Sequence, residues 1–225
     1  MIINNEKYWN KYYLSKKKIN LPSNFAKFVK KKFLKKRDIV LDVATGNGRD
    51  SFFLSKHTKF VYGIDKSKIA ININSKKADY LNLKNINFKN LSSQRIKLFK
   101  KKVTFIYARF FIHAISEKIE NKFLNDLKKY FGKNVTVGLE FRTTDDKLIN
   151  KGIKIGKNQR FYTHYRRFVE LKKFEKKLED KNFKIIYKKK GLNLSKTLNE
   201  NPYLCRLIIK QKWSLKIKKK VSYFG

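Results

Sequence analysis

The sequence predicts an α/β fold built on a mostly parallel sheet, and three observations lead to this prediction. Residues 39–43 and 60–64 form short apolar runs, which is typical of strands buried on both faces. A glycine turn and a stretch of about two helical turns lie between them, so the segment forms a strand–turn–helix–strand unit. Further apolar runs then alternate with helical patterns, as in parallel sheets covered by helices.

The first 36 residues are predicted to form a helical arm. Its main helix is expected at residues 22–36, with Ser23 as the N-cap. Before it, an aromatic cluster is placed on a short helix: Tyr8, Trp9, Tyr12 and Tyr13. Residues 37–225 are predicted to form the core, and the whole chain, residues 1–225, is expected to be one domain.

The core elements follow from hydrophobic periodicity and capping residues. Strands are expected at residues 39–43, 60–64, 86–88, 103–107, 134–141, 183–187 and 203–209. Besides the helix after the glycine turn, helices are expected at residues 67–79, 116–130 and 169–181, with Ser116 as an N-cap. A long connection is expected between residues 142 and 168.

Composition narrows the class of protein. With 225 residues and 41% hydrophobic residues, the chain is long and apolar enough for a sizeable core. The sequence shows no apolar run of about 18 residues and no apolar core of a signal peptide, so a cytoplasmic protein is expected. Cys205 is the single cysteine, which excludes an internal disulfide and a multi-cysteine metal site; no metal is predicted.

The net charge of +40 allows two interpretations. It could reflect binding to a polyanion such as RNA or an anionic membrane surface. Nine of the 57 cations are arginine and the rest are lysine, so compositional drift on solvated faces is the other interpretation and the one we favour. Nonspecific binding to nucleic acid or anionic membranes at low salt is expected in either case.

The glycine turn indicates the kind of ligand. Gly46 and Gly48 let the backbone approach a ligand closely, and Asp65 ends the next strand, where a carboxylate can accept ribose hydroxyls. Ser51 stands where a dinucleotide fingerprint needs its third glycine. The carboxylate of Asp42, which lies ahead of the turn, is poorly placed next to a negatively charged pyrophosphate. It suits a nucleoside ligand that carries positive charge.

The spacing acid-x-x-x-Gly-x-Gly followed by a strand-ending acid resembles motifs I and II of the class I S-adenosylmethionine (SAM) methyltransferases. The resemblance covers nearly the whole chain and implies a Rossmann-like seven-stranded sheet with helices on both faces and a C-terminal antiparallel strand pair. It also implies SAM as cofactor. The residues expected to bind SAM are Asp42, Ala44, Gly46, Asn47, Gly48, Asp65 and Asn90. Asn90 stands where the family often has an acid that meets the adenine amine.

The acceptor is expected over the ends of the fourth and fifth strands. Arginines gather there in a chain that otherwise uses lysine, and their planar forks match carboxylates and phosphates. We therefore predict a small anionic acceptor. Its expected ligands are Arg109, Arg142, Arg166, Arg167 and Tyr165. Some of these arginines could instead pair with acids such as Glu140, Asp145 or Asp50.

Oxygen methylation benefits from a general base, for which His113 and His164 are the candidates. Each could also be a packing residue. Residues 107–115, together with His164-Tyr-Arg-Arg, resemble bacterial methyltransferases of polysaccharide biosynthesis. The segment Gly-Asn-Gly-Arg-Asp-Ser is also similar to tellurite- and thiopurine-type methyltransferases.

Two alternatives remain open at this point. An RNA methyltransferase would explain the charge, although the sequence after the fourth strand lacks the Asn/Asp-Pro-Pro-Tyr/Phe motif of amino-directed base methyltransferases. A noncatalytic subunit with this fold would bind SAM weakly or not at all. The acceptor, the methylated atom and the oligomeric state do not follow from the sequence.

Overall fold

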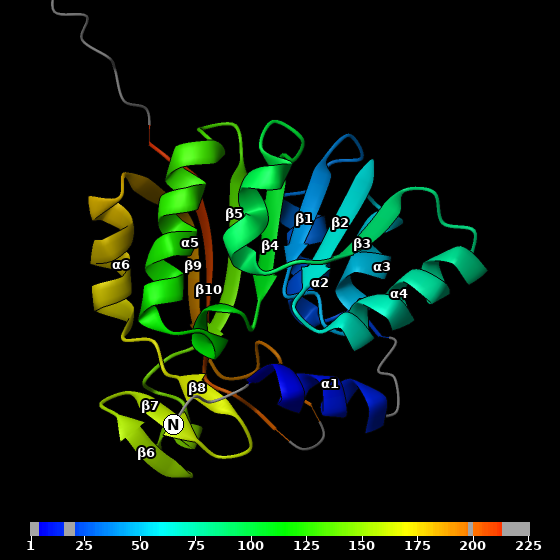
Figure 1. Ribbon diagram of the computed structural model, residues 1–225. Coiled ribbons are helices and arrows are strands. Elements are labelled where there is room, and N and C mark those ends of the chain that lie inside the picture. Colours follow the sequence, from blue (N-terminus) through cyan, green and yellow to red (C-terminus); the bar gives the residue numbers. More distant parts are fainter. Residues whose placement is uncertain (1–4, 16–20, 198–199, 213–225) are drawn as a thin grey trace, which may run out of the picture.

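A computed structural model describes residues 5–15, 21–197 and 200–212 (Figure 1). Its centre is a seven-stranded sheet in the order β3-β2-β1-β4-β5-β10-β9. The strands are β1 (Ile39–Val43), β2 (Phe60–Asp65), β3 (Ile86–Asn90), β4 (Phe105–Arg109), β5 (Thr136–Arg142), β9 (Phe183–Gly191) and β10 (Leu204–Gln211). Strands β1 to β5 are parallel, while β10 runs antiparallel to both β5 and β9. This confirms the predicted fold class, including the C-terminal antiparallel pair.

Helices cover both faces of the sheet (Figure 1). On one face α2 (Asn24–Lys32), α3 (Arg49–Ser55) and α4 (Lys68–Tyr80) bury apolar side chains in one core cluster. On the other face the 3-10 helix η1 (Ser93–Phe99), α5 (Glu117–Tyr130) and α6 (Leu171–Asp180) build a second cluster. Burial on both faces explains why the central strands β1 and β4 are mostly apolar, whereas the edge strands β3 and β9 alternate between buried and exposed positions.

Serine caps begin three of these helices. The hydroxyls of Ser23, Ser67 and Ser116 each accept a backbone N–H of the first turn, which satisfies a donor that the helix itself leaves unpaired. The expected caps Ser23 and Ser116 are therefore confirmed. The main helix of the arm, α2, is shorter than predicted: it ends at Lys32, and the chain leaves it at Phe33, whose ring packs against Phe28 and Tyr187.

A second sheet occupies the region predicted as a long connection, and that prediction was wrong. Strands β6 (Ile153–Gly156), β7 (Gln159–Phe161) and β8 (Tyr165–Arg167) form an antiparallel sheet of their own. Two further 3-10 turns, η2 (Ile112–Ala114) and η3 (Lys147–Asn150), lie in the loops after β4 and β5. Figure 1 shows the small sheet below the large one, on the same side as the helix α1 (Asn5–Ser15).

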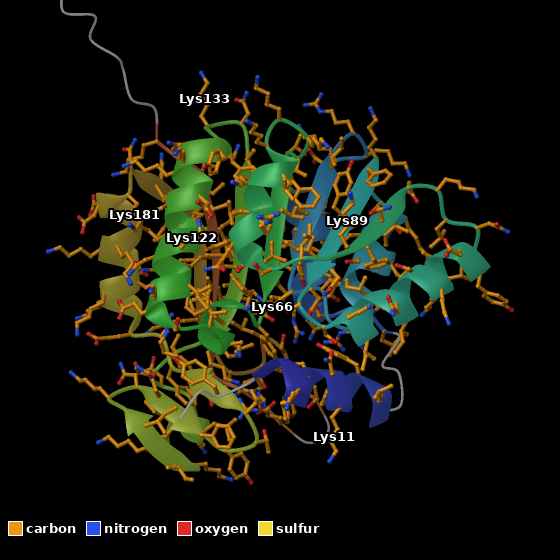
Figure 2. The ribbon with its side chains drawn as sticks, viewed as in Figure 1. Lys11, Lys66, Lys89, Lys122, Lys133 and Lys181 are labelled. Carbon is orange, nitrogen blue, oxygen red and sulfur yellow. The ribbon has the colours of Figure 1, made fainter. Side chains whose placement is uncertain are left out.

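Lysine side chains are spread over the whole molecule. Figure 2 shows Lys133 and Lys181 toward one end of the large sheet, and Lys11 on α1 at the other. Cations that are distributed in this way keep their hydration, and their mutual repulsion is spread over a large surface. Among the described residues, none of the helices has the length and apolar character needed to cross a membrane.

Candidate functional site

A cavity of about 800 Å³ opens where β1, β2 and β4 end, and α1 contributes to its wall. Sites for small ligands have volumes of roughly 300–1,000 Å³, so this cavity is large enough for a nucleoside together with an acceptor. Carboxyl ends of parallel strands are the usual ligand position in open α/β sheets. The predicted cofactor residues Asp42, Ala44, Gly46, Asn47 and Asp65 all line it.

The turn after β1 is held in a strained conformation. Ala44, Gly46 and Gly48 have φ of 60°, 56° and 70°, in the left-handed region that non-glycine residues avoid. Asn74 on α4 supports the turn, since its Nδ2 donates to the Gly46 carbonyl at 2.8 Å. Phe110, which lines the cavity after β4, also has a positive φ of 56°. Strained residues concentrate at functional sites, and two non-glycine examples meet in this cavity.

Gly48 shapes the turn without lining the cavity. It precedes α3, and a Cβ on it would come within 2.8 Å of the Asn74 side chain. Gly46 is needed for a different reason: a Cβ there would lie 2.6 Å from the Tyr13 hydroxyl. The two glycines therefore allow α4 and α1 to close in on the turn from two sides.

Asp42 is a buried carboxylate at the floor of the cavity. Its Oδ2 accepts hydrogen bonds from the Ser51 hydroxyl at 2.5 Å and the Thr45 hydroxyl at 2.9 Å. Burial raises its pKa to about 7, against the two hydroxyls that lower it. Ser51 thus has a clear role where a third glycine is missing: it supplies a donor to Asp42. A cation next to this carboxylate would favour its charged form.

Asp65 ties β2 to the glycine turn. Its Oδ2 accepts the Gly46 N–H and its Oδ1 accepts the Ser67 N–H, both at 2.9 Å. A carboxylate oxygen can accept more than one hydrogen bond, and Asp65 lines the cavity, where a ligand hydroxyl would meet it. Asp65 therefore fixes the turn and also presents acceptors to the cavity.

Asn90 is placed differently from the other predicted cofactor residues. Its amide Nδ2 donates to the carbonyls of Asp65 and Lys66, at 3.0 and 2.7 Å, and it is exposed beside the cavity rather than lining it. The cavity wall on this side is made by Leu91, Ser93 and Gln94. These three residues were missed because η1, which carries two of them, has no periodic signal in the sequence.

Helix α1 covers the cavity with aromatic rings. Trp9, Tyr12 and Tyr13 line it. The rings of Tyr8 and Trp9 lie 4.7 and 4.8 Å from the ring of His164, measured between centroids. Further along the helix, the Ser67 hydroxyl donates to Asn10 at 2.6 Å. Contacts with both the small sheet and α4 therefore fix the position of α1.

Most of the predicted acceptor-binding arginines are paired with acids of the protein. Arg109 lines the cavity, but its Nε donates to the fully buried Glu140 at 2.9 Å. Arg142 bonds Asp146 at 2.9 Å and Glu200 at 2.5 Å, and it is buried. These pairs organise the ends of β4 and β5.

Arg167 and Tyr165 lie on the same face of β8. Arg167 bonds the buried Glu120 and the carbonyls of Ile112 and Ile115, away from the cavity. Tyr165 does line the cavity, and its hydroxyl donates to Gln159 at 3.2 Å. Arg166, the remaining predicted arginine, is half-buried near Arg142 and does not reach the cavity.

Arg49 differs from these arginines. It begins α3, directly after the glycine turn, and lines the cavity. Within the described part of the chain its guanidinium makes no hydrogen bond or ion pair. Burial and the nearby Arg109 lower its pKa, yet a guanidinium stays charged at neutral pH. The cavity thus has a cation beside the turn that protein acids leave available.

The two histidines lie outside the cavity wall. His113 is buried and its Nδ1 accepts the Arg142 N–H at 3.2 Å, while burial lowers its pKa well below the usual value. Burial and the cations Arg166 and Arg142 lower the pKa of His164 to about 3. Both imidazoles are therefore neutral near pH 7. In this arrangement His113 holds the end of β5 and His164 holds α1.

Comparisons with known proteins agree with this geometry. The sequence model of a methyltransferase domain family matches residues 34–140, which contain the glycine turn, both acids and strands β1 to β5 up to Glu140. A probable cobalt-precorrin-6B C(15)-methyltransferase (decarboxylating) from Methanococcus vannielii is 36% identical over 86 residues. That match covers 38% of this chain and 48% of the archaeal protein, so the chain spans about half the length of this curated relative.

Solved structures extend the likeness of the fold to most of the chain. A SAM-dependent methyltransferase from Methanosarcina mazei superposes with a TM-score of 0.69 at 18% identity, covering 82% of this chain and 97% of that one. A SAM-dependent methyltransferase from Anabaena variabilis gives a TM-score of 0.68 at 20% identity, with 92% and 93% covered.

Proposed function

We propose that the protein is a SAM-dependent methyltransferase that transfers a methyl group from SAM to an oxygen of a small anionic acceptor. The match of a methyltransferase domain model to residues 34–140 and the likeness of the fold to a SAM-dependent methyltransferase support this proposal. The observation that carries the proposal is the wall around the glycine turn. There, two carboxylates suited to SAM lie in the same cavity as Arg49, whose guanidinium has no hydrogen-bond or ion-pair partner among the described residues.

The residues of the cavity fit SAM. Asp42 offers a buried carboxylate to the ammonium of its methionine part, and Asp65 offers oxygens to ribose hydroxyls. Gly46 and the neighbouring Ala44 expose backbone rather than side chain to the ligand. When bound, SAM supplies a methyl group that its sulfonium already activates. The protein therefore contributes mainly by position, through the turn, the two acids and α1.

Arg49 and Arg109 would hold the acceptor's negative group. Arg109 is oriented by Glu140 and by Phe110, whose ring centroid lies 4.0 Å from its guanidinium carbon. Arg49 has its whole fork available, and a fork can bind a carboxylate or a phosphate with two hydrogen bonds. Among the described residues the cavity wall has no histidine. We therefore propose that the methylated oxygen is already ionised, so that no imidazole base is needed.

Replacing Arg49 tests this proposal. Arg49→Met should raise the acceptor KM about tenfold or more, because a charge-assisted hydrogen bond contributes about 1.5–3 kcal/mol. Arg49→Lys keeps the charge, loses the fork and should fall between the wild type and Arg49→Met. Labelled methyl transfer from SAM to a fractionated metabolite extract, acidic against neutral fractions, identifies the acceptor for these measurements.

Calorimetry of SAM binding serves as the control. The Arg49 variants should bind SAM as the wild type does. A large loss of SAM affinity on Arg49→Met would mean that Arg49 holds the cofactor instead, and incorporation confined to neutral fractions would overturn the anionic acceptor.

We further propose that the polysaccharide-biosynthesis resemblance points to a sugar precursor as the acceptor. A phosphorylated or uronic-acid sugar has the small size and the negative charge that the cavity and Arg49 suit. Methylation of a phosphosugar by the purified protein supports this choice of acceptor.

A further inference from the structure

The small sheet carries three cations in register across its strands. Lys154 on β6 pairs with Arg160 on β7, and Arg160 pairs with Arg166 on β8. Directly paired residues of antiparallel strands project from the same face. Lys154, Arg160 and Arg166, which we call the cation ladder, therefore form a row of positive charge across all three strands.

The opposite face of the sheet contacts the rest of the molecule through β8. Side chains alternate along a strand, so Tyr165 and Arg167 project away from Arg166. Tyr165 lines the cavity and Arg167 pairs with the buried Glu120. The cation ladder thus lies on the face opposite to Tyr165 and Arg167, and its Arg166 end is half-buried near Arg142.

The cation ladder lacks compensating acids. The sequence has no acidic residue from 147 to 169, and no ion pair is formed by these three side chains within the described residues. Like charges placed directly opposite each other destabilise a sheet. Burial and the neighbouring cation Arg142 lower the pKa of Arg166; Glu200 and Asp146 act against this shift, but both are bonded to Arg142. A bound anion would relieve this repulsion.

Arg160 is fixed in place at the centre of the ladder. Its Nη1 donates to the carbonyls of Gln159 at 2.9 Å and Gly156 at 3.2 Å, around the turn between β6 and β7. No bond uses its Nε or Nη2 within the described residues. A guanidinium anchored on one side loses less side-chain entropy when its other donors bind an anion.

We propose that the cation ladder is a binding site for linked phosphates, such as a diphosphate or a longer phosphate chain on a small molecule. Neighbouring strands lie about 4.8 Å apart, so the ladder presents closely spaced cations in a line, as successive phosphates require. Arginine forks match phosphate oxygens bidentately.

The ladder also leads toward the cavity. Its Arg166 end lies beside Arg142, and Glu200, the partner of Arg142, lines the cavity. In Figure 1 the small sheet and α1 lie on the side of the large sheet where the cavity opens. If the phosphates belong to the methyl acceptor, the ladder anchors one end of it while the other end enters the cavity. That last step rests on the proposed function, and phosphate binding by the ladder does not.

Matched triple variants of the full chain test the site. One variant replaces Lys154, Arg160 and Arg166 with Gln. The other replaces Lys97, Lys100 and Lys102 with Gln; it removes the same charge from exposed positions before β4, at the sheet end opposite the cavity. Calorimetry with inorganic triphosphate should show a loss of affinity of tenfold or more for the ladder variant and less than twofold for the control. The affinity should also depend less steeply on salt concentration in the ladder variant than in the control, because the ladder variant loses charge contacts that salt screens.

Three outcomes would overturn the proposal. Equal losses in both triple variants would show a general charge effect, and no loss in either would show that the ladder binds no phosphate. Ladder-dependent binding of a single-stranded oligonucleotide without ladder-dependent binding of triphosphate would assign the face to nucleic acid. SAM affinity is measured for the wild type and for both triple variants, so that the methyltransferase proposal and the phosphate-site proposal can be tested separately. A wild type that fails to bind SAM contradicts the methyltransferase proposal and leaves the phosphate result readable.

Discussion

Asp42 should make cofactor binding depend on pH. Its buried carboxyl has a pKa of about 7 in the free protein, so it holds a proton below that pH and is charged above it. The ammonium of SAM binds the charged form, and binding below pH 7 must therefore release the proton. We expect SAM affinity to rise from pH 6 to 7.5 and then to level off, as measured by calorimetry in buffers of different ionisation enthalpy.

Two substitutions separate this effect from a general loss of binding. Asp42→Asn should weaken binding and remove the pH dependence, because no titrating group remains. Asp65→Asn should weaken binding but leave the pH dependence in place. A wild-type affinity that stays flat between pH 6 and 7.5 would contradict the role given to Asp42.

The residues of the site that sequence reasoning found are those whose geometry is local. Asp42, Gly46 and Asp65 lie within one strand–turn–helix–strand unit, so their spacing alone places them around one cavity. The arginines could not be assigned in this way. Whether Arg109 or Arg142 is available depends on Glu140, Asp146 and Glu200, and two of these pairings join residues 31 and 58 positions apart. Periodicity carries no information about such pairs.

The histidines illustrate the same limit. His113 follows β4 at the expected place, but the register of η2 turns its Nδ1 to the Arg142 N–H rather than into the cavity. His164 directly precedes β8, a strand of three residues that the sequence did not predict. Only its ring contacts with Tyr8 and Trp9 reveal that it supports α1.

At the scale of elements, α1 should control how tightly the cofactor is held. Trp9 lines the cavity and packs on His164, so Trp9→Ala removes cover from the ligand and a contact that orders the helix. We expect the dissociation constant for SAM to rise at least about fivefold, which corresponds to about 1 kcal/mol. Lys11→Ala, on the exposed side of the same helix, should leave it unchanged. Calorimetry on both variants provides the measurement, and equal effects would deny α1 this role.

The glycine turn offers a second test at this scale. Gly48→Ala combines a positive φ of 70° with a Cβ that would lie 2.8 Å from Asn74, whereas Gly132→Ala combines a similar φ of 58° with open space. Backbone strain alone costs about 1 kcal/mol, and the clash should add at least as much again for Gly48. Urea denaturation should therefore show a clearly larger loss of unfolding free energy for Gly48→Ala. Equal losses would mean that Asn74 moves aside without cost.

For the whole molecule, the order of elements was readable from the sequence and their ends were not. Apolar runs such as Ile39–Val43 identified the central strands of the large sheet, because both faces are covered there. The edge strands β3 and β9 have alternating burial instead. The small sheet was missed because β7 and β8 have three residues each, and their side chains are divided between a core face and a charged face. So short an alternation does not stand out from a polar loop.

The charge of the whole molecule leads to a final prediction. Against 57 cations the chain has 17 acids, and several of these are already committed to buried pairs, such as Glu140 with Arg109 and Arg206. The remaining lysines repel one another across the surface, and this repulsion favours the expanded, unfolded chain. Raising NaCl from about 50 mM to about 500 mM shortens the screening length from roughly 14 to 4 Å, which weakens this repulsion more than it weakens buried pairs. The melting temperature should therefore rise with salt, as followed by circular dichroism. A fall in the melting temperature would mean that the ion pairs contribute more to stability than the repulsion of the net charge takes away.

Sulfate and chloride can be compared at equal ionic strength. If the melting temperature rises more in sulfate, and this extra rise disappears in the variant without the cation ladder, part of the stabilisation comes from the small sheet.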